Sequence, residues 1–192
     1  MDNQLIIFAK NPVLGKVKTR LAATVGNQKA LEIYKELLAY TCAICSKANA
    51  NKFVFYSDFI DEQDLWNETK HKKKLQWGND LGKRMANAFE ETLNNDSKAI
   101  IIGTDCKELT PEIINQAFGA LEYVDVVLGP AVDGGYYLIG MKNLNMNLFN
   151  DISWSTSQVL DQTINKMNKE KLSYLLLKTL SDIDTEEDLK RP

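Results

Sequence analysis

The chain has 192 residues, of which 44% are hydrophobic and 26% are charged, and this composition is typical of a globular domain that buries its own core. It excludes intrinsic disorder, a collagen-like fold and a coiled coil. With 23 basic and 26 acidic residues the net charge is -3, so we expect no nucleic-acid partner, because the positive charge of a general nucleic-acid binder is missing.

The sequence favours a cytoplasmic protein without a membrane partner. No stretch approaches the ~20 apolar residues of a membrane helix, and residues 1–9 lack the basic and apolar regions of a secretion signal. Three cysteines, an odd number, are typical of free thiols in a reducing compartment. A single histidine, His71, lies far from the other motifs and argues against a Ser-His-Asp or Cys-His hydrolase.

In chain order, short apolar runs alternate with longer amphipathic segments. Strands are expected at 4–9, 52–57, 72–76, 99–103, 125–129, 136–141 and 172–177, and helices at 28–48, 80–94, 110–122, 155–168 and 185–190. This alternation predicts a single α/β domain with a mixed, mainly parallel sheet and helices on both faces. Ligands of such sheets bind beyond the carboxyl ends of the strands, so the residues that follow each strand are the candidates for function.

A cationic loop follows the first strand. The segment 10–20, KNPVLGKVKTR, contains one glycine, Gly15, and four basic residues: Lys10, Lys16, Lys18 and Arg20. A glycine-bearing loop that leads toward a helix and carries cations suits a polyphosphate. It is not a Walker A motif, because no Ser or Thr follows Gly15-Lys16. An exposed basic loop without a ligand is the alternative.

Acidic residues follow two of the strands. Asp105 comes after the apolar run 99–103, where it could bind a metal, transfer a proton or form a turn. After the last strand, Asp182 and Asp184 would share one face of an extended segment, and either of them, or Thr185, could instead cap the closing helix. Because a magnesium site takes only one or two carboxylates besides waters and phosphates, Asp105 and one acid of this pair would be enough.

The segment GPAVDGGYY contains Asp133, Gly134 and Gly135. Adjacent glycines let a backbone approach a ligand closely, although an Asp-Gly-Gly hairpin turn is common without any ligand. Trp154 belongs either to the core or to the wall of an acceptor site, and Ser155 could cap the helix that follows.

A strand-to-helix turn with two glycines spans residues 76–82. Gln76 and the backbone of Gly78 could contact the edge of a nucleobase there. The alternative is that this segment is only a turn in which Asp80 caps the next helix.

Four motifs together resemble one family: FAKNPVLGKVKTRL, GTDCKELTPEII, GPAVDGGYYLIG and DIDTEEDL. In this order, over nearly the whole chain, they resemble the small GT-A-like transferases once catalogued as a domain of unknown function. Members are labelled "transferase 1, radical-SAM/selenodomain-associated" and are similar to nucleotide-diphospho-sugar transferases and guanylyltransferases. The resemblance implies one Rossmann-like GT-A domain over residues 1–192, with a nucleotide-binding half at 1–106 and an acceptor half at 107–192.

The resemblance also implies roles for single residues. Phosphate would be bound by Gly15, Lys18 and Arg20, with Lys10 nearby, and the nucleobase by Gln76 and Gly78. A Mg²⁺ or Mn²⁺ ion would be held by Asp105 and Asp184, and the acceptor would face Asp133, Gly134 and Gly135. Among the candidates from the residues themselves, we expect Asp105 and Asp133 to be catalytic and Trp154 to contact the acceptor. The chain departs from the family pattern at Lys107 and Glu186, which stand where Pro is usual, and the superfamily's GG-x-G-x-R loop is absent.

The sequence therefore predicts a metal-dependent transferase that uses an activated nucleotide. The family label and the missing glycine loop favour a glycosyltransferase that moves sugar from a nucleotide-sugar donor to a small acceptor. A nucleotidyltransferase that uses a nucleoside triphosphate and releases pyrophosphate is the first alternative. A non-catalytic nucleotide-binding module and a plain interaction domain are the others. The donor, the acceptor and the oligomeric state are left open.

Overall fold

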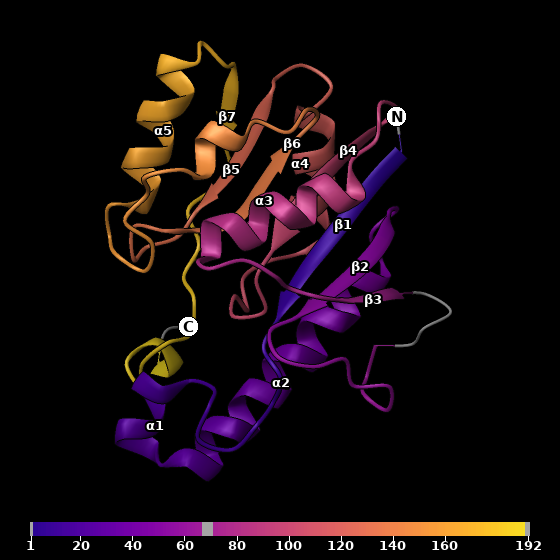
Figure 1. Ribbon diagram of the computed structural model, residues 1–192. Helices are drawn as coiled ribbons and strands as arrows, with labels where there is room; N and C mark the ends of the chain where they lie inside the picture. The colour runs from indigo at the N-terminus through magenta and orange to yellow at the C-terminus, as the bar shows by residue number, and fades with distance from the viewer. Residues whose placement is uncertain (1, 67–70, 191–192) are drawn as a thin grey trace.

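The computed structural model describes residues 2–66 and 71–190 and contains one seven-stranded sheet (Figure 1). The strand order is β3-β2-β1-β4-β6-β5-β7, and β6 runs antiparallel to both of its neighbours while the other pairings are parallel. This confirms the mixed, mainly parallel sheet. The strands are β1 (Asp2–Ala9), β2 (Asn51–Tyr56), β3 (His71–Leu75), β4 (Ser97–Ile102), β5 (Val126–Pro130), β6 (Tyr136–Met141) and β7 (Tyr174–Leu176).

Helices cover both faces of the sheet, as predicted. One core cluster joins the sheet to α2 (Asn27–Ser46) and α4 (Pro111–Ala120). The cluster on the other face joins it to α3 (Leu81–Thr92), α5 (Val159–Lys169) and the 3-10 turn η1 (Met146–Phe149). Within the described residues, no helix combines the length and apolar composition that a membrane span requires.

The strand β1 is buried on both faces of the sheet, which explains why its sequence is a continuous apolar run. Leu5 and Ile7 point into the core on one face, and Ile6 points into the core on the other. Its neighbours are β2 and β4. Ala9 pairs with Tyr56, the last residue of β2, and Ile7 pairs with Ile102, the last residue of β4. The chain adds β2 and β3 on one side of β1 and then crosses to β4 on the other side. The loops after β1 and β4 therefore open at one edge, where doubly wound sheets bind ligands.

Two helix starts follow the predicted capping chemistry. The Thr110 side chain accepts a hydrogen bond from the Ile113 backbone N–H, with Pro111 at the first helical position of α4. The Asp80 carboxylate accepts one from the Lys83 backbone N–H and caps α3.

Other helix boundaries differ from the prediction. A short helix, α1 (Thr19–Val25), follows the cationic loop, where no helix was expected before residue 28. The helix expected from residue 155 begins only at Val159, so Gln158 rather than Ser155 occupies its N-cap position. At the C-terminal end, the 3-10 turn η2 (Asp188–Lys190) lies beside α1, where Leu189 packs against the cluster that contains Leu21 (Figure 1).

The crowding around β6 gives a stability prediction. A Cβ atom on Gly140 would lie 2.6 Å from Ile100 Cγ2 and 2.9 Å from Val127 Cγ1, so Gly140→Ala should lower the free energy of unfolding by about 1–3 kcal/mol. Gly119, exposed in α4, has no atom within 4 Å of such a Cβ. Gly119→Ala should instead raise stability by about 0.5–1 kcal/mol, since alanine favours the helix. Urea denaturation of both variants measures the difference, and equal effects would contradict the packing argument.

Candidate functional site

A pocket of about 500 Å³ opens at the carboxyl edge of the sheet. Its lining comes from the loops after β1, β4 and β5, from the loop before α5 and from the segment after β7. Eight residues proposed from the sequence line it: Lys10, Lys18, Arg20, Asp105, Asp133, Gly135, Trp154 and Asp184. Segments from both ends of the chain thus meet at the predicted place.

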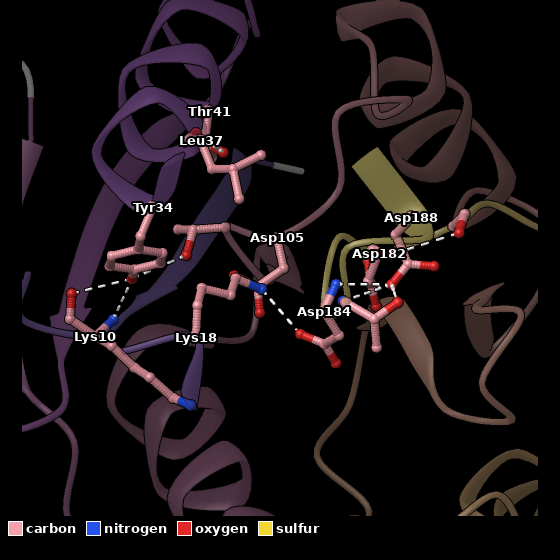
Figure 2. A network of polar contacts seen from close by, with 12 residues as sticks. Lys10, Lys18, Tyr34, Leu37, Thr41, Asp105, Asp182, Asp184 and Asp188 are labelled. Atoms are coloured by element: carbon pink, nitrogen blue, oxygen red, sulfur yellow. Dashed lines mark hydrogen bonds and ion pairs between the residues drawn. The ribbon is translucent and has the colours of Figure 1, made fainter. Parts of the chain in front are cut away.

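Lys18 lies at the centre of this pocket. Its Nζ is 3.0 Å from Asp105 Oδ1 and 2.9 Å from Asp184 Oδ1, and Figure 2 shows its side chain reaching between them. The Lys18 side chain is only 4% exposed, whereas each of the two carboxylates is 39% exposed. The Lys18 backbone is left-handed (φ 48°, ψ 45°), and its carbonyl accepts the first hydrogen bond of α1, from the Ala22 N–H.

Backbone contacts bring Asp184 beside Asp105. The Ile183 N–H donates to the Asp105 carbonyl at 3.0 Å, and the buried Ile183 side chain packs in the cluster between α1 and α2. The Asp184 N–H donates to Asp188 Oδ2 at 3.0 Å, and the Thr185 hydroxyl donates to the same oxygen at 2.8 Å. Asp188, rather than Asp182, Asp184 or Thr185, therefore accepts the backbone hydrogen bonds of this turn, which leaves the Asp184 carboxylate available to Lys18.

Tyr34, on α2, is a site residue that the sequence analysis missed. Its hydroxyl accepts a hydrogen bond from the Lys10 N–H at 2.9 Å and lies 3.2 Å from the Thr104 hydroxyl, so it joins the loop after β1 to the loop after β4 (Figure 2). Burial and the nearby Asp105 carboxylate raise the pKa of Tyr34, which keeps the hydroxyl neutral. The available signal was a tyrosine in an apolar helix stripe, whose buried hydroxyl needs a partner.

Four aspartates line the pocket, whereas Lys18 is the buried basic residue among its lining residues. Asp182 lines it together with Asp105, Asp133 and Asp184. Burial, and then the charges of Asp105 and Asp133, raise the pKa of Asp182 to about 7. Burial alone would lower the pKa of Lys18, but the Asp105 and Asp184 carboxylates outweigh it and raise this pKa, so the ammonium remains charged.

The Asp-Gly-Gly segment is both a turn and part of the pocket. The Gly135 N–H donates to Asp133 Oδ1 at 2.9 Å, which closes a tight turn. Gly134 has φ 87°, and a Cβ there would lie 2.2 Å from the Ser157 carbonyl oxygen, so only glycine fits against the loop before α5. Gly134 therefore positions that loop without lining the pocket, while Asp133 and Gly135 line it.

Trp154 lies in the same loop and packs on the start of α3. A Cβ on Gly82 would lie 2.4 Å from the Trp154 ring, so the absence of a side chain at residue 82 makes room for the indole. The ring and the half-exposed Leu81 line one side of the pocket, with the hydroxyl-bearing residues 155–157 beside them.

Three residues proposed for phosphate or base binding are not among the pocket-lining residues. The Gln76 side-chain amide donates to the Phe55 carbonyl at 2.8 Å. The Gly78 carbonyl accepts a hydrogen bond from Arg84 Nε at 3.2 Å, and the Gly78 backbone packs against α3. Gly15 shapes the cationic loop with φ 76° and does not line the pocket either. Base recognition by Gln76 and Gly78 stays a prediction.

The residues present fit a divalent cation that needs few protein ligands. In the described parts of the chain, no three His, Cys, Asp or Glu side chains form a ready metal site. Asp105 and Asp184, however, already share one cation, the Lys18 ammonium, at 2.9–3.0 Å, and both are partly exposed to the pocket. Two carboxylate oxygens completed by waters and phosphates are a donor set that suits Mg²⁺ or Mn²⁺.

Comparison with known proteins identifies the family. Residues 40–156, more than half of the chain, match the family described as "Uncharacterized protein conserved in bacteria (DUF2064)". The chain belongs to this family. No curated protein matches it. The narrower grouping suggested by the four motifs stays a prediction.

Solved structures show the same fold. A candidate nucleotide-diphospho-sugar transferase from Desulfovibrio desulfuricans G20 is 31% identical with a TM-score of 0.85, and the match covers 96% of this chain and 84% of that one. The inositol-1-phosphate CTP transferase from T. maritima has a TM-score of 0.62 at 14% identity, with 98% and 92% covered. The complex of Rv0371c with manganese from Mycobacterium tuberculosis H37Rv has a TM-score of 0.60 at 9% identity, with 100% and 97% covered. This DUF2064 protein thus has the fold of nucleotide-diphospho-sugar transferases and nucleotidyltransferases.

The raised pKa of Asp182 predicts a pH-dependent stability. Its folded-state pKa of about 7 exceeds the unfolded value of about 3.9, so wild-type protein loses stability as pH rises between these values. Asp182→Asn removes the buried charge and should be close to neutral at pH 4 but stabilising at pH 8. The gain is at most about 4 kcal/mol, since one pKa unit corresponds to about 1.4 kcal/mol.

Denaturant unfolding at both pH values, with EDTA present, measures this effect. Asp96→Asn is the matched control, because Asp96 is exposed at the opposite end of β4. A stability gain of Asp182→Asn that is equal at pH 4 and pH 8 would contradict the assignment.

Proposed function

We propose that this DUF2064 protein is a metal-dependent transferase that uses an activated nucleotide. The observation that carries the proposal is the arrangement of Lys18 between Asp105 and Asp184, beside a cationic loop at the carboxyl edge of the sheet. Opposed cationic and acidic groups in one pocket are what a nucleoside diphosphate and its divalent counter-ion require. The shared fold with nucleotide-diphospho-sugar transferases supports the same proposal.

Each group then has a chemical role. Lys10, Lys16 and Arg20 are exposed in the pocket and would bind the phosphates through charge-assisted hydrogen bonds. Asp105 and Asp184 would hold Mg²⁺ or Mn²⁺. When bound, such an ion supplies positive charge that neutralises the diphosphate and the departing phosphate oxygen. Tyr34 keeps the two loops that carry these groups in register.

Of the two transfer reactions, we propose glycosyl transfer. In that reaction the bond between the sugar carbon and the phosphate oxygen breaks and a nucleoside diphosphate leaves. An acceptor hydroxyl forms the new bond and passes its proton to a base. Asp133, Asp182 and Trp154 line the same pocket, and Asp133 is our candidate for the base. The Asp133 carboxylate would repel a phosphate acceptor, which nucleotidyl transfer to a sugar phosphate needs.

Nucleotidyl transfer is the second candidate. It is favoured by the likeness of the fold to the inositol-1-phosphate CTP transferase, although at 14% identity that likeness concerns the fold alone. In that reaction the acceptor attacks the α-phosphorus of a nucleoside triphosphate, and pyrophosphate leaves.

The metal role predicts the effect of Asp105→Ala. This variant should lose Mn²⁺-dependent nucleotide binding, because one of two carboxylate ligands is gone, and should still unfold cooperatively. Asp96→Ala removes an exposed acid from the other end of β4 and should bind as wild type does. Isothermal titration with and without Mn²⁺ measures both, and unchanged Mn²⁺-dependent affinity in Asp105→Ala would refute the metal role.

A thermal-shift panel separates the two reactions. Nucleoside triphosphates, diphosphates and sugar nucleotides are each tested with and without Mn²⁺, since a ligand that binds only the folded state raises Tm. A Mn²⁺-dependent shift with one sugar nucleotide and none with triphosphates is the expected result. A shift with a triphosphate alone would favour nucleotidyl transfer, and no shift with any nucleotide would contradict the transferase proposal.

A further inference from the structure

One buried ammonium neutralises the two carboxylates proposed to hold the metal. Lys18 Nζ contacts Asp105 Oδ1 and Asp184 Oδ1 at 3.0 and 2.9 Å, and the Lys18 side chain is 4% exposed. Two carboxylates this close to one point repel each other strongly in a partly dehydrated pocket unless a cation lies between them. Lys18 supplies that cation.

The other basic residues of the loop are arranged differently. Lys10, Lys16 and Arg20 line the same pocket with exposed side chains, and no ion pair with a described residue is recorded for them. They are available to an incoming phosphate at once, whereas Lys18 is already held by two carboxylates. Lys18 therefore differs in function from its neighbours.

The backbone holds Lys18 in this position. A left-handed conformation is strained for a non-glycine residue, and the first hydrogen bond of α1, together with the buried Val17 beside it, keeps Lys18 there. The lysine side chain has four methylene groups joined by rotatable bonds, so the ammonium can change partners while the backbone stays in place.

A divalent cation and the Lys18 ammonium need the same two oxygen atoms. A nucleoside diphosphate brings phosphate oxygens into the pocket and so offers the ammonium another partner. We propose that Lys18 is an internal counter-ion that competes with the divalent metal ion for Asp105 and Asp184, and that nucleotide binding releases these carboxylates by attracting Lys18 to its phosphates. This inference rests on the proposed function.

The exchange makes the affinities for nucleotide and for metal depend on each other. Nucleotide strengthens metal binding by removing a competitor, and by linkage the metal strengthens nucleotide binding by the same factor. It also keeps the pocket from holding metal tightly before nucleotide arrives.

Removal of the ammonium tests the competition directly. Mn²⁺ binding to nucleotide-free protein is measured from the EPR signal of free Mn²⁺, for wild type and Lys18→Met. We expect Lys18→Met to bind Mn²⁺ about tenfold more tightly or better, because the carboxylates lose their cation. Lys35→Met, which removes an exposed lysine of α2 away from the pocket, should leave the affinity unchanged. Mn²⁺ affinity in Lys18→Met equal to or below that of wild type would overturn the proposal.

A second variant keeps the test decisive if Lys18→Met does not fold. Lys18→Gly also removes the ammonium, and glycine adopts the left-handed backbone of residue 18 without strain. It should show the same tighter Mn²⁺ binding and a cooperative unfolding transition. If Lys18→Gly is folded and its Mn²⁺ affinity is unchanged, the competition is refuted even where Lys18→Met fails to fold.

The nucleotide arm separates this inference from the proposed function. Affinities for ADP, CDP, GDP and UDP are measured by titration calorimetry with Mn²⁺ and with EDTA. In wild type, Mn²⁺ should strengthen binding of at least one diphosphate, and the factor should be smaller in Lys18→Met. If no diphosphate binds wild type, the proposed nucleotide chemistry fails, while the Mn²⁺ titration still decides whether Lys18 competes with the metal.

Discussion

The arrangement of this pocket depends on the two ion pairs that the buried Lys18 ammonium forms with Asp105 and Asp184. An ammonium removed from water is costly unless charged partners surround it, and its two partners come from the loop after β4 and from the segment after β7. Both carboxylates must therefore lie within about 3 Å of one point. The Ile183 N–H bond to the Asp105 carbonyl and the packing of Leu189 beside α1 fix the C-terminal segment so that this is possible. The segment from Ile183 to Leu189 is thus part of the site, and its loss would leave Lys18 without the Asp184 carboxylate.

The crossing of the chain from β3 to β4 determines where the pocket opens. The antiparallel strand β6 determines where the turn that contains Asp133 lies. Because β6 returns beside β4, the turn at 131–135 reaches the carboxyl edge of the sheet from the neighbouring strand β5. Gly134 then contacts the loop that carries Trp154, so the acidic turn and the aromatic wall are positioned together. The cationic loop after β1 lines the same pocket. The cationic loop and the acidic turn thus line one pocket from two different strands of the sheet.

The sequence predicted those features that depend on the ends of strands. Lys18, Asp105 and Asp133 come after apolar runs, and the rule that ligands bind beyond such runs was sufficient to place them at one pocket. Features that depend on contacts between distant segments were not predictable. Tyr34 looks like any apolar position of α2, and only the closeness of Lys10 and Thr104 gives its hydroxyl a role. Gln76 and Gly78 also follow a strand, but β3 lies at the edge of the sheet, two strands from β1, and local contacts occupy both residues. The start of α5 was misplaced because the contact of Gly134 with Ser157, which capping rules do not describe, shapes the loop before it.

The two departures from the family pattern do not weaken the catalytic proposal. Lys107 is exposed in the turn after Asp105 and does not line the pocket. Glu186 forms an ion pair with Lys190 at 3.1 Å, one helical turn along the chain, and it points to a local role at the C-terminal turn. A non-catalytic nucleotide-binding module needs only groups that contact the nucleotide and its metal. Asp133 and Asp182 line the pocket although the phosphates of a bound nucleotide do not need them, and the burial of Asp182 disfavours its charged form. Carboxylates placed where the fold disfavours their charge are more typical of catalytic sites than of sites that only bind.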